Sequence, residues 1–141
     1  MRRTSIERAN FRLIESELYS FHDTLQELEN LKKDIILATP ARDSEIRTTD
    51  ISNETQARAL NLVSSPEILE LSRRVSAIQF AIDMLKQAPE PRKYDLLRLK
   101  YFERRLTDQG IMRELHIEQA TFYRWRREII QLIAGKLGWK V

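Results

Sequence analysis

The chain of 141 residues contains no cysteine, which excludes disulfides and any metal or redox centre held by thiolates. Its only two histidines, His22 and His116, lie far apart in the sequence and predict no metal site. Clustered acid pairs, glycine-rich phosphate loops and nucleophile motifs are also missing. We therefore expect no enzymatic activity, no cofactor and no bound metal.

Long apolar runs are missing as well. None approaches the roughly 20 residues that a helix needs to span a bilayer. The N-terminal residues Met-Arg-Arg-Thr-Ser-Ile-Glu-Arg lack the apolar core of a signal peptide. We expect a soluble, cytoplasmic protein without a membrane partner.

Glycine is scarce and confined to the end of the chain. The three glycines are Gly110, Gly135 and Gly138, so residues 1–109 have none. A stretch of that length without glycine, rich in leucine, glutamate, arginine and isoleucine, favours long helices over strands and tight turns. The sequence predicts an all-α fold.

The first predicted helix runs from about Thr4 to Ala38, and Pro40 ends it. Thr4 and Glu7 have the spacing of a capping box. The apolar residues of this helix are spaced 3, 4, 3, 4 and 3, as in a heptad seam: Phe11, Ile14, Leu18, Phe21, Leu25 and Leu28. Residues 40–53 are polar and aperiodic and predict a loop, and a short helix is expected over residues 54–63.

A second long helix is predicted to begin at Ser65-Pro66, with serine as the N-cap and proline in the first turn. Its apolar residues repeat the same heptad spacing: Ile68, Leu71, Val75, Ile78, Ile82 and Leu85. Two matched seams predict a helical hairpin over residues 1–88. Apolar residues off the seam leave two alternatives open, a bundle within one chain and an interface between two copies.

Residues 89–141 form the second predicted domain, after Pro89 and Pro91. They hold 12 Lys or Arg and 7 Asp or Glu, a net charge of +5, whereas residues 1–88 hold 12 and 14, a net charge of −2. A helix over about Arg92–Arg104 would support the two helices that follow. This excess of positive charge is what a surface that meets phosphates requires.

A helix-turn-helix pattern occupies residues 107–127. Counted from Asp108, its apolar residues fall at the fourth, eighth, tenth, fifteenth and eighteenth positions, where two short helices must pack: Ile111, Leu115, Ile117, Phe122 and Trp125. His116 stands in the turn, where glycine is frequent, and would need a left-handed backbone. The alternative is an amphipathic helical hairpin without a role in DNA binding.

The last helix, over residues 118–134, is the predicted reading helix, and Gly138 is expected to break its continuation. Phe122, Trp125, Ile129, Leu132 and Ile133 share a stripe that we assign to the core. The predicted DNA contacts are Gln119, Ala120, Thr121, Tyr123, Arg124, Arg126, Arg127 and, before the motif, Arg105. Arginine can pair with guanine and glutamine with adenine in the major groove. Arg105 and Arg126 are expected to contact phosphate.

The run Leu115-His-Ile-Glu-Gln-Ala-Thr-Phe-Tyr-Arg-Trp-Arg-Arg-Glu-Ile-Ile, with Ile133-Ala-Gly-Lys-Leu-Gly-Trp139, resembles the C-terminus of the RinA-type phage transcriptional regulators, which are close to the ArpU-type late regulators. The resemblance implies a sigma-like DNA-binding domain and an activator of late phage genes for packaging and morphogenesis. It places the protein in the cytoplasm of a bacterial host. By residue matching, Tyr123, Arg124, Trp125 and Arg126 take the reading-helix positions, although this chain opens the helix with Glu118-Gln119-Ala120 instead of serine and basic residues.

Three functions therefore remain open at this point. The first is a sequence-specific transcription regulator, with double-stranded DNA as partner and host RNA polymerase as a second candidate. A homo-oligomer, with a dimer favoured, suits this function. The second is a small terminase-like packaging protein, which would form a ring. The third is a helical protein-interaction module that uses the heptad seams.

Overall fold

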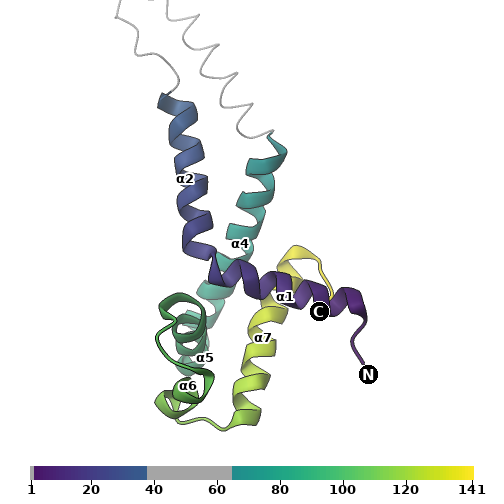
Figure 1. Ribbon diagram of the computed structural model, residues 1–141, viewed down its shortest axis with the longest axis vertical. Helices are drawn as coiled ribbons and strands as arrows, with labels where there is room; N and C mark the ends of the chain where they lie inside the picture. The colour runs from purple at the N-terminus through teal and green to yellow at the C-terminus, as the bar shows by residue number, and fades with distance from the viewer. Residues whose placement is uncertain (1, 38–64) are drawn as a thin grey trace, which may run out of the picture. The chain divides into compact units, whose positions relative to one another are not determined.

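A computed structural model describes residues 2–37 and 65–141 (Figure 1). Within these two ranges the chain is helical and has no strand, which confirms the predicted all-α class. The elements are α1 (Ser5–Tyr19), α2 (Phe21–Leu37), α4 (Pro66–Gln87), α5 (Pro91–Leu97), the π-helical turn η1 (Arg98–Glu103), α6 (Asp108–Leu115) and α7 (Gln119–Leu137). The predicted loop 40–53 and short helix 54–63 lie outside the described residues.

The N-terminal capping box is confirmed. The Thr4 side chain accepts a hydrogen bond from the Glu7 amide at 3.1 Å, and the Glu7 carboxylate accepts one from the Thr4 amide at 2.8 Å. These two bonds satisfy amides that the first helical turn leaves without partners.

The prediction of one continuous first helix is wrong, because Ser20 separates α1 from α2. The Ser20 hydroxyl donates to the Ser16 carbonyl at 2.9 Å, and the Ser20 amide donates to the same oxygen at 3.1 Å. A serine hydroxyl that competes for a helical carbonyl favours a bend over continued helix. The heptad spacing continues through this residue, so the apolar pattern alone gives no sign of the break.

Two compact units result from the contacts within the chain. One contains Met1–His22 and Arg74–Val141, and the other contains Asp23–Arg73. This grouping differs from the predicted division at residues 88 and 89, because α1 packs with the C-terminal helices. The predicted helical hairpin stays a prediction.

The core of the first unit is built by α1, the part of α4 from Arg74 onward, α5, η1, α6 and α7, with α1 in contact with both α7 and η1. Its largest fully buried side chains are Ile14, Leu18, Leu96, Leu97, Tyr101, Ile111, Phe122, Ile129, Ile130 and Ile133. The helix predicted over Arg92–Arg104 is present, but its second half is π-helical. There the Arg104 amide reaches back five residues to the Leu99 carbonyl at 3.1 Å. Such wide turns are rare and shift the side chains that follow around the helix axis.

Candidate nucleic-acid interface

A short turn joins α6 to α7, and His116 takes the left-handed conformation that the sequence requires of it. Its backbone angles are φ 54° and ψ 48°. The amide of Ile117 donates back to the Met112 carbonyl at 3.0 Å, which closes the end of α6. Glu118 is then the N-cap of α7, so only three residues separate the two helices. At its other end α6 is capped by Thr107, whose side chain accepts from the Gly110 amide at 3.1 Å.

Arg92 of α5 fixes the C-terminal end of α6. Its Nη1 donates to the Leu115 carbonyl at 3.2 Å, and its guanidinium lies 5.5 Å from the centre of the Trp125 ring. Glu90 accepts from the same arginine at 2.9 Å, and these hydrogen bonds lower the pKa of Glu90 to about 2. One arginine therefore contacts the end of α6 and a buried tryptophan of α7 at the same time.

The first three turns of α7 have a buried side and an exposed side. Phe122, Trp125 and Ile129 are buried, as the pattern predicted. The exposed side holds predicted DNA contacts, namely Gln119, Ala120, Tyr123, Arg124 and Arg127. Residues at positions 120, 123, 124 and 127 share one face of a helix. We call these four residues together with Gln119 the presented face.

The remaining predicted contacts lie elsewhere. Thr121 is half-buried, and Arg105 is exposed in the segment between η1 and α6. Arg104, just before it, has the left-handed backbone that ends η1 (φ 56°), and its guanidinium lies 4.8 Å from the centre of the Tyr19 ring. Arg105 is thus exposed shortly before α6 in the chain and is not part of the presented face on α7.

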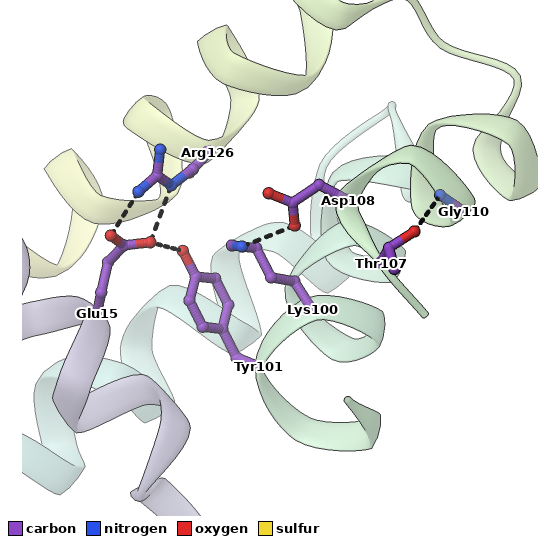
Figure 2. Close-up of polar contacts among 7 residues, drawn as sticks. All are labelled: Glu15, Lys100, Tyr101, Thr107, Asp108, Gly110 and Arg126. Atoms are coloured by element: carbon purple, nitrogen blue, oxygen red, sulfur yellow. Dashed lines mark hydrogen bonds and ion pairs between the residues drawn. The ribbon is translucent and has the colours of Figure 1, made fainter. Parts of the chain in front are cut away.

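Arg126 does not belong to the presented face, because its guanidinium is bound by a carboxylate of α1. Its Nε donates to Glu15 Oε2 at 2.8 Å and its Nη2 donates to Glu15 Oε1 at 2.5 Å (Figure 2). Tyr101 of η1 donates its hydroxyl to the same Oε2 at 2.6 Å. The side chains of Arg126 and Glu15 are 28% and 14% exposed. The structure therefore places Arg126, a predicted phosphate contact, in an ion pair with Glu15.

The pKa values of these three groups follow from their pairing. Burial by itself raises the pKa of Glu15, but the hydrogen bonds from Arg126 and Tyr101 outweigh it, so the pKa lies below its ordinary value. The hydrogen bond to Glu15 raises the pKa of Arg126. Burial, and then Glu15, raise the pKa of the Tyr101 hydroxyl. Glu15 is therefore an anion, Arg126 a cation and Tyr101 a neutral donor near neutral pH.

A second half-buried cation lies next to this group. Lys100 of η1 donates to Asp108 Oδ1, in the first turn of α6, at 2.9 Å (Figure 2), and only 10% of its side chain is exposed. Its ammonium lies 5.6 Å from the centre of the Tyr101 ring and 5.9 Å from that of Phe122. Burial opposes the charge of Lys100, but the bond to Asp108 and neighbouring groups raise its pKa on balance. This pair fixes the start of α6 against η1.

Sequence reasoning missed both of these ion pairs. Glu15 and Arg126 are separated by 111 positions, and Lys100 and Asp108 belong to different helices. A partial signal was present, because Glu15 and Glu17 flank the apolar seam, where coiled coils place charges that pair between helices. Both do form such pairs, since Glu17 accepts from Arg74 of α4 at 2.5 Å. The spacing indicates that these acids pair, but it does not identify their partners.

Comparison with known proteins gives no match to a family model, to a curated protein or to a solved structure. Among the described residues, no helix has the length and apolar character to cross a membrane. The same residues contain no cluster of histidine, aspartate or glutamate that could hold a metal ion.

Proposed function

We propose that this chain is a sequence-specific DNA-binding transcription regulator that reads the major groove with the N-terminal part of α7. The observation that carries the proposal is the presented face, which displays Tyr123, Arg124 and Arg127 to solvent while the other side of the helix is buried. The helix is preceded by a tight turn and a second short helix, an arrangement typical of helix-turn-helix readers.

The side chains of the presented face suit base recognition. Arg124 and Arg127 have the fork of donors that matches guanine O6 and N7, and Gln119 can pair with adenine. Ala120 is small enough to contact a thymine methyl group, and Tyr123 can donate to phosphate. Exposed Arg105, close to the start of α6, is the proposed phosphate contact outside α7. Arg126 is left out, because Glu15 binds it.

We further propose that the regulator is of the RinA type and activates late phage genes in a bacterial host. The support is the run of residues 115–139, which carries the resemblance in sequence and also forms the presented face and the left-handed end of α7 at Gly138. A dimer with host RNA polymerase as a second partner completes this proposal. Paired half-sites would match the two-fold symmetry of such a dimer.

The test is selection of fragments of the genome that encodes the protein, bound at about 150 mM salt, where non-specific binding is weak. A sharp peak upstream of a block of genes supports the regulator, and a repeated half-site supports the dimer. A peak inside a packaging gene, together with a ring of many subunits, would support the small terminase instead. Absence of enrichment for a folded protein would overturn the proposal and favour a protein-interaction module.

Arg124→Ala tests the presented face with the selected site. It should weaken specific binding by about 1–3 kcal/mol and relax the choice of base at one position. Arg12→Ala is the matched control, because it removes the same charge from an exposed position on α1. Equal effects of the two substitutions would mean that α7 contributes only general charge.

A further inference from the structure

One of the three arginines near the start of α7 is bound by a carboxylate of α1. Arg124 and Arg127 are exposed, whereas Arg126 is bound by Glu15. On the helix surface Arg126 lies next to Tyr123, three residues earlier. A free arginine at this place would stand at the border of the presented face, within reach of a DNA backbone in a groove that α7 enters.

Glu15 is itself held in place on several sides. Its Oε2 accepts from both Tyr101 and Arg126, and its Oε1 accepts the second bond from Arg126 (Figure 2). Tyr101 is 1% exposed and cannot turn away without disturbing the core. The ring of Phe11, one turn before Glu15 on α1, has its centre 5.1 Å from the Arg126 guanidinium. A carboxylate fixed in this way is a competitor that phosphate must displace to bind Arg126.

We infer that Glu15 is a positioning residue that withholds Arg126 from the DNA backbone and so limits the number of cations that α7 presents to phosphate. The inference rests on the proposed function. It gives α1 a second role besides packing, since the contact between α1 and α7 sets the electrostatic part of DNA binding. Loss of the carboxylate charge would add one arginine to the interface, although Glu15 itself touches no DNA.

The experiment measures the salt dependence of binding to a short duplex of mixed sequence for the parent chain, Glu15→Gln and Glu17→Gln. Glu17 is the matched control, because it lies on the same helix, carries the same charge and pairs with Arg74 of α4. Each additional phosphate contact steepens the plot of log K against log salt by about 0.9. Glu15→Gln should therefore lose about 3.5-fold more affinity than the parent between roughly 50 and 200 mM salt. Glu17→Gln should follow the parent.

Equal slopes for Glu15→Gln and the parent would overturn the inference, as would equal changes for Glu15→Gln and Glu17→Gln, which would reflect net charge alone. Failure of the parent to bind any DNA at low salt would instead overturn the proposed function, and this inference with it.

Arg126→Gln provides a second measurement that does not depend on the folding of Glu15→Gln. Its slope should equal that of the parent, because the parent does not use Arg126 at phosphate. A slope shallower by about 0.9 would mean that Arg126 already contacts phosphate, and would overturn the inference. Far-UV circular dichroism of each variant verifies that it is helical under the binding conditions.

Discussion

The ion pair between Glu15 and Arg126 should stabilise the fold, and a double-mutant cycle measures by how much. Glu15 accepts hydrogen bonds from Arg126 and Tyr101, and bonds to charged groups contribute about 1.5–3 kcal/mol each. Removing one partner from a fully buried pair costs about 3–5 kcal/mol. The two side chains are 14% and 28% exposed, so water compensates for part of that loss. We therefore expect Glu15→Met and Arg126→Met each to lower the free energy of unfolding by about 2–3 kcal/mol.

The double variant Glu15→Met/Arg126→Met should lower the free energy of unfolding little more than either single variant, because it leaves no unpaired charge between α1 and α7. This corresponds to a coupling energy of about 2 kcal/mol. Urea unfolding followed by circular dichroism gives the four free energies. Glu17→Met with Arg126→Met is the control cycle, and its effects should add to within about 0.5 kcal/mol, because Glu17 pairs with Arg74. A Glu15–Arg126 coupling below about 0.5 kcal/mol would refute the reasoning.

Further predictions concern pH and the backbone. The folded pKa of Glu15 lies below its ordinary value of 4.5, so the stability that it contributes is present above pH 4.5 and lost as the pH falls through the folded pKa. The difference in unfolding free energy between the parent and Glu15→Gln should therefore shrink below pH 4.5 in acid unfolding. A constant difference would contradict the lowered pKa. Gly135→Ala should raise the free energy of unfolding by about 0.5–1 kcal/mol, because Gly135 lies in a helix and an added Cβ meets nothing within 4 Å. Gly138→Ala should lower it by about 1 kcal/mol, because the φ of Gly138 is 74°. Urea titration of both variants checks the opposite signs. Exposed His116 has a φ of 54°, which glycine adopts at less cost, so His116→Gly should stabilise the fold by about 0.5–1 kcal/mol in thermal unfolding. The control His22→Gly should destabilise it, because His22 lies in a helix.

The heptad spacing predicted the buried side of the first helix but not its break at Ser20. Ile14, Leu18 and Phe21 are buried as the seam requires, although the helix is interrupted at Ser20 between the last two. Apolar spacing records which residues avoid water, and a short interruption leaves that pattern unchanged. The break coincides with the hydrogen bond between the Ser20 hydroxyl and the Ser16 carbonyl. Serines in helices often form no such bond, so the presence of a serine does not by itself predict a break.

The sequence by itself determined the features that depend on neighbours a few residues apart. The capping box at Thr4, the helix start at Pro66, the left-handed turn at His116 and the helix end at Gly138 all follow from local hydrogen bonds and backbone sterics. The exposed placement of Arg124 and Arg127 belongs with them, because helical periodicity puts both opposite Phe122 and Ile129.

Only the tertiary structure decided which distant groups meet. Helical periodicity places Arg126 at the side of the reading helix, but it does not show that α1 returns to α7 and puts Glu15 against it. Charge attraction is nearly independent of sequence separation, and an arginine at a helix border has many possible partners of opposite charge. The partner is selected by packing, here by the burial of Ile14, Leu18 and Tyr101 in one core. That packing places Arg126, a predicted phosphate contact, in an ion pair with Glu15.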